Sequence, residues 1–158
     1  MWCLFSDTLD FDKQSYKDND AVGKKLLTAF LCKHGHTVSE NSDKYGIDLV
    51  SEINGKKYYW EVEIKNNVTW TDSSDFPYPT VSFLARKAKW KDKNFWYVII
   101  SGKKFSAIFA HSSKIFDEKY REQKFIRKDN RFGSDHFYRV PLSICTFLTP
   151  DKFLGNEG

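Results

Sequence analysis

A hairpin signal in the first half of the chain constrains the fold more than any other feature. Within residues 45–65, two short runs typical of β-strands flank Asn54-Gly55. Asn-Gly favours a two-residue turn because both residues tolerate a positive φ. Successive strand side chains point to opposite faces, so the second run separates into an apolar and a largely charged row. The apolar row is Tyr58, Trp60, Val62 and Ile64, and the opposite row is Tyr59, Glu61, Glu63 and Lys65.

A tight turn also predicts which residues of the two strands face each other. If Ile53 pairs with Lys56, Asp48 lies across from Glu61, and Gly46 lies across from Glu63. Opposed strand residues sit roughly 4.5–5.5 Å apart at Cβ, so the three acids would form one carboxylate cluster. Like charges at this spacing destabilise a sheet unless a hard cation such as Mg²⁺ or Mn²⁺ binds between them. The sequence therefore predicts a metal site at Asp48, Glu61 and Glu63, with Lys65 beside it to steady a phosphate or a water molecule.

An Asp early in a hairpin followed by Glu-x-Lys on the next strand resembles the PD-(D/E)xK nuclease superfamily. Its restriction-endonuclease-like members include phage nucleases and archaeal Holliday-junction resolvases. Asp48 matches the motif Asp, and Glu63-Ile64-Lys65 matches Glu-x-Lys. A second register, in which Glu61-Val62-Glu63 resembles the variant with an acid in place of the Lys, stays open. The resemblance covers residues 20–100.

The resemblance implies a fold and an activity. The implied fold is α/β, with a restriction-endonuclease-like three-layer core and a mixed central sheet of four to five strands flanked by helices. The implied activity is Mg²⁺-dependent hydrolysis of DNA, with branched DNA as a candidate substrate, a homodimer as a candidate assembly and a phage as a candidate setting.

Length, composition and cysteine usage bound the class of protein. A chain of 158 residues that is 41% hydrophobic and 17% aromatic predicts one globular domain. The net charge of +4 permits nucleic-acid binding without requiring it. Cys3, Cys32 and Cys145 have no metal or disulfide spacing, and neither a secretory leader nor a membrane-length apolar run is present. We therefore expect a cytoplasmic protein in a reducing interior.

The first predicted element after an N-terminal arm, residues 1–19, is an amphipathic helix. From Asp20, apolar residues recur at helical spacing as far as Leu31, and Gly35 stands where a helix ends. Lys24 and Lys25 lie on the polar side with Thr28, either as phosphate contacts or as a solvated face. The family's extra metal-site Glu would fall on Lys24, so the resemblance departs from the family pattern there.

A loop of residues 66–80 follows the charged strand, and at this length a loop is usually functional or mobile. Trp70 and Tyr78 in it either stack on bases or anchor the loop by burial. The densest basic stretch comes next, and we expect it on a helix that begins near Ser82. Its cations either contact phosphates or complement the helix dipole. They are Arg86, Lys87, Lys89, Lys91 and Lys93.

The rest of the chain is expected to complete the core, residues 20–110, and to add an extension, residues 111–158. Residues 95–100 are typical of a strand buried on both faces by helices, and 105–110 of its partner strand. A short helix from Ser112 to Tyr120 and a second basic zone, residues 119–131, follow. Pro141 predicts an edge or a break in the last apolar segment.

Three hypotheses follow from these patterns. The first is a nuclease in which Asp48, Glu61 and Glu63 hold Mg²⁺ or Mn²⁺ and Lys65 assists catalysis. The second is a non-catalytic module on the same fold that binds nucleic acid or a protein. The third is an accessory protein whose acidic row pairs internally with Lys57 and Lys65.

Overall fold

The computed structural model describes five stretches of the chain, residues 19–40, 47–85, 87–88, 95–125 and 134–155. Residues 1–18 of the predicted N-terminal arm, Gly46, Arg86, Lys89 and residues 126–131 of the second basic zone lie outside these stretches. None of the helices within them is long and apolar enough to cross a membrane.

The first helix forms as the apolar spacing predicts. Helix α1 (Asn19–Lys33) buries Val22, Leu26 and Leu31 against the sheet, and Gly35 ends it with a φ of 92°. Thr28, expected on the polar side, is buried instead. A Cβ atom on Gly23 would lie 3.2 Å from Cγ2 of Val62, so a glycine here lets the helix approach the sheet closely.

The predicted hairpin is confirmed, register included. Strands β2 (Leu49–Ile53) and β3 (Lys56–Lys65) pair antiparallel, with Ile53 opposite Lys56 and Leu49 opposite Trp60. Asn54 and Gly55 have φ angles of 53° and 77°, as this type of turn requires.

The hairpin belongs to a mixed sheet of six strands, where four or five were expected, in the order β1-β2-β3-β5-β6-β9. Strand β3 runs parallel to β5, and all other neighbours are antiparallel. The remaining four strands are β1 (Thr37–Glu40), β5 (Phe95–Ser101), β6 (Ala107–His111) and β9 (Thr146–Leu148). The buried strand predicted at residues 95–100 and its partner are thus confirmed.

The connection from β3 to β5 contains a strand where the sequence predicted a helix. Strand β4 (Thr80–Leu84) includes Ser82, the expected helix start. Val81 and Phe83 are buried while their neighbours are only partly so, which is the period of a strand. The helix prediction was wrong because it gave more weight to the cations that follow than to this short alternation.

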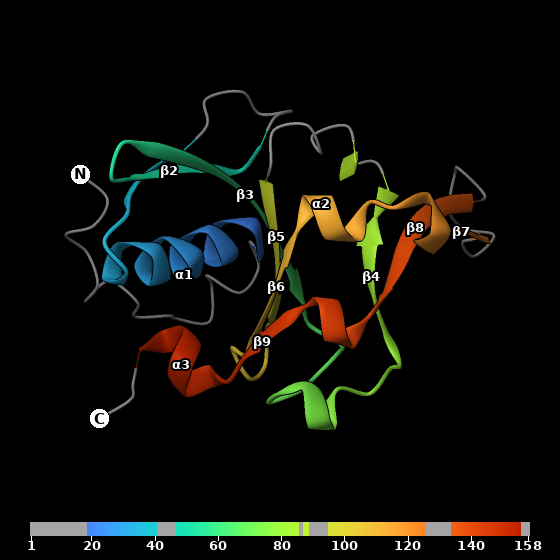
Figure 1. The fold of residues 1–158 in the computed structure, drawn as a ribbon. Coiled ribbons are helices and arrows are strands. Elements are labelled where there is room, and N and C mark those ends of the chain that lie inside the picture. The colour runs from blue at the N-terminus through green and yellow to red at the C-terminus, as the bar shows by residue number, and fades with distance from the viewer. Residues whose placement is uncertain (1–18, 41–46, 86, 89–94, 126–133, 156–158) are drawn as a thin grey trace.

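Strand β4 belongs to a second sheet of three strands in the order β4-β8-β7. Its other members are β7 (Arg121–Phe125) and β8 (Ser134–Pro141). Figure 1 shows this sheet on one side of the six-stranded sheet and α1 with α3 (Pro150–Leu154) on the other. The expected flanking of the sheet by helices holds for the α1 face, whereas the second sheet covers most of the other face. Pro141 ends β8, the middle strand of the second sheet, rather than marking a sheet edge.

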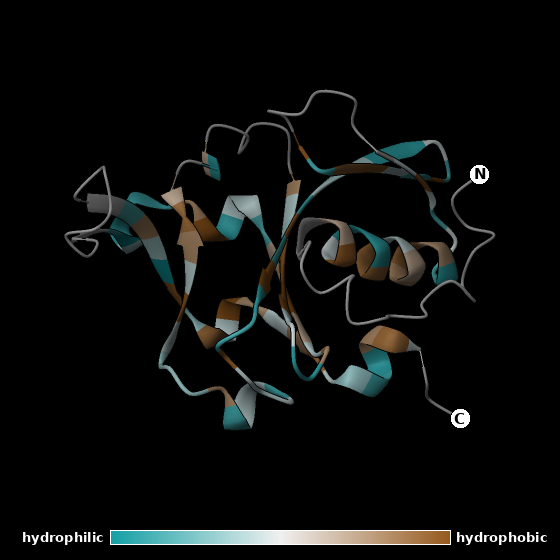
Figure 2. Cartoon of the chain, turned by 180° about the vertical axis from the view of Figure 1, so that it is seen from behind, coloured by the Kyte–Doolittle hydropathy of each residue, from teal (hydrophilic) through white to brown (hydrophobic). Residues whose placement is uncertain are grey.

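Two hydrophobic cores lie on the two faces of the central sheet. One joins α1 and α3 to Trp60, Val62 and other residues of the sheet. The other lies between the two sheets and includes Phe83 and Tyr97. Figure 2 shows hydrophobic residues concentrated on the central strands. The charged row of β3 faces the second sheet, because the alternate residues Trp60 and Val62 pack with α1.

The C-terminal segment is built into both sheets, since β8 pairs with β4 and β9 pairs with β6. The helix expected from Ser112 to Tyr120 is shorter: α2 (Ser112–Ile115) ends early, and a separate 3₁₀ turn covers Glu118–Tyr120. Short 3₁₀ turns also occur at Ser73–Asp75 and Leu142–Ile144.

One cysteine departs from expectation. Cys32 packs against the α1 core as the sequence predicted, but it is disulfide-bonded, which its spacing did not predict. Unpaired cysteines therefore no longer support the expectation of a reducing interior. Cys145 is free, and burial raises the pKa of its thiol to about 12.

Candidate active site

The charged row of β3 is enclosed rather than solvated. Glu61 is 1% exposed, although charged carboxylates are seldom buried without a partner. It lies under the second sheet because strand alternation places it opposite Trp60 and Val62, which pack against α1. Burial of a carboxylate costs free energy, so a carboxylate buried in this way indicates a functional site rather than a position that only stabilises the fold.

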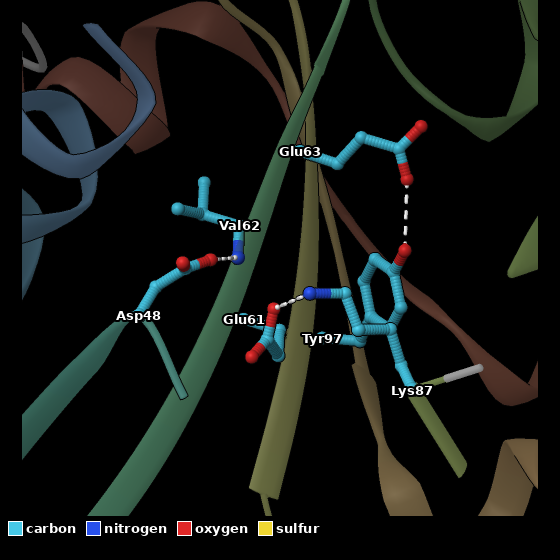
Figure 3. A network of polar contacts seen from close by, with 6 residues as sticks. All are labelled: Asp48, Glu61, Val62, Glu63, Lys87 and Tyr97. Atoms are coloured by element: carbon cyan, nitrogen blue, oxygen red, sulfur yellow. Dashed lines mark hydrogen bonds and ion pairs between the residues drawn. The ribbon is translucent and has the colours of Figure 1, made fainter. Parts of the chain in front are cut away.

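Asp48 is positioned by the hairpin. It immediately precedes β2, and its Oδ2 accepts a hydrogen bond from the backbone N–H of Val62 at 3.0 Å. This bond crosses the hairpin and fixes the Asp48 carboxylate beside that of Glu61 (Figure 3). The pairing of Asp48 with Glu61 predicted from the turn is thus what the structure forms.

The environment of Glu61 favours its protonated form. Burial, followed by the negative charge of Asp48, raises the pKa of the Glu61 carboxyl to about 7, against an ordinary value of 4.5. One of its oxygens, Oε1, is buried and has no hydrogen-bond partner. A proton or a cation between the two carboxylates would satisfy that oxygen.

Lys87 provides the counter-charge. Its Nζ lies 2.7 Å from Oε2 of Glu61, and this ion pair partly offsets the rise in the pKa of the carboxyl. The sequence placed Lys87 on a helix as a phosphate contact. Strand β4 instead ends at Leu84, and Lys87, which follows it in 3₁₀ geometry, lies beside Glu61. Its contact with phosphate stays a prediction. A helical periodicity argument could not have found the contact with Glu61.

Glu63 is engaged with a different partner. Its Oε1 accepts a hydrogen bond from the Tyr97 hydroxyl at 2.8 Å, and its Oε2 lies 3.6 Å from Nζ of Lys65. Burial, then the charge of Glu63, raises the pKa of the Tyr97 phenol well above its usual value, so the phenol stays a donor. Figure 3 shows Glu63 extending away from Asp48 toward Tyr97. The sequence did not identify Tyr97, because only the tertiary structure shows that it lies on the neighbouring parallel strand.

These contacts bear on the two motif registers left open by the sequence. Asp48 is brought together with Glu61, and Glu63 is joined to Lys65 and Tyr97. The geometry therefore groups Asp48 with Glu61 rather than with Glu63, and Lys87 pairs with Glu61.

The acid pair can be tested for its fit to the divalent cation that the family resemblance implies. Among the described residues, no three or more His, Cys, Asp or Glu side chains form a metal-binding group, so the expected cluster of three carboxylates is not formed. Two carboxylates remain, and one of them has a buried oxygen without a partner. Mg²⁺ commonly binds through one or two carboxylates, with water and substrate phosphate as its other ligands. Asp48 and Glu61 fit that pattern.

The two aromatic residues of the loop have different environments. Trp70 is 1% exposed, which corrects the expectation that it stacks on a base and agrees with its role as a loop anchor. Tyr78 is 54% exposed. Burial thus leaves Tyr78 as the loop aromatic that a ligand can reach.

The basic residues predicted to bind nucleic acid that the structure describes lie on two different faces of the central sheet. Lys24 and Lys25 lie on α1, which covers the face of the sheet opposite Glu61. Lys87 is at the acid pair. Arg86 and Lys89 lie outside the described residues.

Comparison with protein-family models and with curated proteins found no match to this chain.

Proposed function

We propose that this protein is a metal-dependent nuclease that hydrolyses phosphodiester bonds in DNA. The observation that carries the proposal is the buried Glu61 carboxylate, which has one oxygen without a partner and the Asp48 carboxylate beside it. The position of this pair on a hairpin agrees with the PD-(D/E)xK resemblance.

Asp48 and Glu61 would hold Mg²⁺ or Mn²⁺, with Glu63 next to them on the same face of β3. Such an ion, when bound, lowers the pKa of a water molecule and neutralises charge on a phosphate. The Val62 N–H orients Asp48, and the Lys87 ammonium favours the ionised, metal-binding form of Glu61. Lys87 and Lys65, which pair with Glu61 and Glu63, would hold phosphate oxygens as negative charge develops. A preference for branched DNA and a homodimeric assembly remain proposals drawn from the resemblance.

A non-catalytic binding module on the same fold is the second candidate. It is favoured by the internal ion pairs, since Glu61 pairs with Lys87 and Glu63 with Lys65. Acids paired in this way have a counter-charge without a metal. In such a module the positive groups would bind nucleic acid, and a chelator would have no effect.

Cleavage of labelled single-stranded, linear duplex and four-way-junction DNA in Mg²⁺ or Mn²⁺, with EDTA as the reference, tests the proposal. We expect Asp48→Asn and Glu61→Gln each to lower cleavage by about 100-fold or more, the scale found when one group that stabilises a transition state is removed. Glu52→Gln is the matched control, because Glu52 is an exposed acid of the same hairpin. It should cut like the wild type.

The outcome that contradicts the nuclease is equally specific. If every substrate stays intact while DNA binding is salt-sensitive and indifferent to EDTA, the protein is the binding module. Circular dichroism of each variant verifies that a loss of cutting is not a loss of folding.

A further inference from the structure

A cavity of about 480 Å³ lies between the two sheets, next to the charged row but apart from the acid pair. Its floor includes Ile99 of β5 and Ile108 of β6, and β4 and β8 form part of its walls. Lys65 lines it, whereas Asp48, Glu61 and Lys87 do not. The volume is within the range of about 300–1,000 Å³ that is usual for small-molecule sites.

The polar lining of the cavity suits an anion. Lys65 and Arg139 both line it, and no Asp or Glu is among its described lining residues. Nε of Arg139 is buried and makes no hydrogen bond, although it forms an ion pair with Oε2 of Glu122 at 3.4 Å. Lys65 forms a longer ion pair with Glu63 at 3.6 Å, so an incoming phosphate would compete with these two carboxylates. A guanidinium fork matches a phosphate group, and the amide of Asn67 adds a further polar group.

The cavity also has aromatic walls, and Tyr78 is the exposed member. Behind it, Phe76 packs edge-on with a centroid separation of 5.9 Å. Phe76 in turn packs against Trp70 at 5.3 Å and Phe147 at 5.6 Å. Tyr78 is therefore a supported aromatic surface beside two cations. This combination is the one that proteins use to stack a base and hold its phosphate.

We propose that this cavity binds one unpaired nucleotide, with its phosphate on Lys65 and Arg139 and its base against Tyr78. The inference rests on the proposed nuclease function and narrows its substrate to DNA that is single-stranded or has an unpaired nucleotide near the cleaved bond. A base inside a duplex must first leave its stack, at a cost of a few kcal/mol. A junction or a single strand presents the base without that cost.

The test is calorimetric binding of the nucleotide dAMP in EDTA, with deoxyadenosine and inorganic phosphate as partial ligands. We expect dAMP to bind at least about 10-fold more tightly than either part, because each engages only one half of the site. Base–aromatic stacking is worth about 1–3 kcal/mol, so Tyr78→Ala should weaken dAMP binding by roughly 5- to 150-fold. Tyr78→Phe keeps the ring and should bind dAMP like the wild type.

Arg139→Gln should weaken dAMP and phosphate binding together, while Lys152→Gln, which removes an exposed cation of α3, should change neither. If Arg139→Gln fails to fold, the Tyr78 variants still decide, because that side chain is largely exposed. Equal affinity for phosphate and dAMP overturns the nucleotide site, and so does dAMP binding that ignores Tyr78→Ala.

Failure here is separable from failure of the proposed function. Glu61→Gln should bind dAMP normally, because Glu61 does not line the cavity. Metal-dependent cleavage without dAMP binding would overturn the nucleotide cavity and leave the nuclease standing. Binding of dAMP without cleavage of any substrate would support the cavity and overturn the nuclease.

Discussion

At the scale of single residues, the proposed chemistry depends on one buried carboxylate. Glu61 is enclosed by the second sheet, faces Asp48 and pairs with Lys87. Removal of a charge from water costs more than one surface-like ion pair returns, so the charged form of Glu61 is a burden on the fold. Functional sites frequently have groups of this kind, whose pKa lies near neutral pH.

The raised pKa of Glu61 predicts a pH-dependent loss of stability. A group that binds its proton more tightly in the folded than in the unfolded state stabilises the fold below its unfolded pKa. That contribution is lost as the pH rises through the folded pKa, which is about 7 for Glu61. At about 1.4 kcal/mol per pKa unit, the free energy of unfolding of the wild type should fall relative to Glu61→Gln by on the order of 3 kcal/mol between pH 5 and pH 8.

Urea unfolding of both proteins at several pH values in EDTA checks this. Burial, and then a positive neighbour, lowers the pKa of both His36 and His111, so the histidines make the protein more stable as the pH rises. This contribution is the same in both proteins and cancels in their difference. For Glu52→Gln, in which an exposed acid is changed, the free energy of unfolding should vary with pH in parallel with that of the wild type. Parallel curves for Glu61→Gln and wild type would show that Glu61 does not titrate in this range.

At the scale of elements, the hairpin turn sets the register on which the acid pair depends. Asn54 and Gly55 both adopt positive φ, and a shift of one residue would move Glu61 to the α1 side of the sheet. The turn is exposed, and a Cβ on Gly55 would meet nothing within 4 Å. The turn therefore favours glycine at position 55 because of its backbone conformation and not because a side chain would lack space.

Gly55→Ala should accordingly destabilise the protein by about 1–2 kcal/mol, the cost of a left-handed conformation for a residue with a side chain. Asn54→Gly at the adjoining position is the matched control, because glycine accepts its φ of 53° without strain. Thermal and urea unfolding measure both changes. A Gly55→Ala variant as stable as Asn54→Gly would mean that the turn does not constrain the hairpin.

At the scale of the whole molecule, the two sheets are interwoven along the chain. Strand β4 lies between β3 and β5 in sequence but belongs to the other sheet, and β8 and β9 of the C-terminal segment extend different sheets. The core between the sheets draws on Tyr138 and Val140 as well as on β5. If either sheet unfolded, the hydrophobic face that the other sheet packs against it would therefore be exposed to water.

A chain that ends at His111 should consequently fail to fold. It loses the middle strand of the second sheet and the buried side chains of Ile115, Phe116, Tyr138, Val140 and Phe153. At about 1.5–3 kcal/mol for each large side chain, this loss is as large as the whole stability of a typical domain, about 5–15 kcal/mol. Near-ultraviolet circular dichroism and a thermal melt test it, with a chain that ends at Gly155 as the folded control. A cooperative melt of the shorter chain would contradict the interwoven arrangement.

The sequence by itself determined the hairpin and the pairing of Asp48 with Glu61. Asn54-Gly55 and the alternation of β3 placed Asp48 opposite Glu61, because turn geometry and strand pleat act within the hairpin. The helix that Gly35 ends and the buried strand at residues 95–100 also follow from local periodicity.

Only the tertiary structure decided what surrounds that pair. The delivery of Lys87 to Glu61, the donation from Tyr97 to Glu63 and the covering second sheet all depend on long-range packing. A short alternating segment such as β4 becomes a strand because β8 supplies its hydrogen bonds, and no local pattern announces that partner. For the same reason the sequence identified the acids but not the groups that tune them, since charge and burial at Glu61 come from residues distant along the chain.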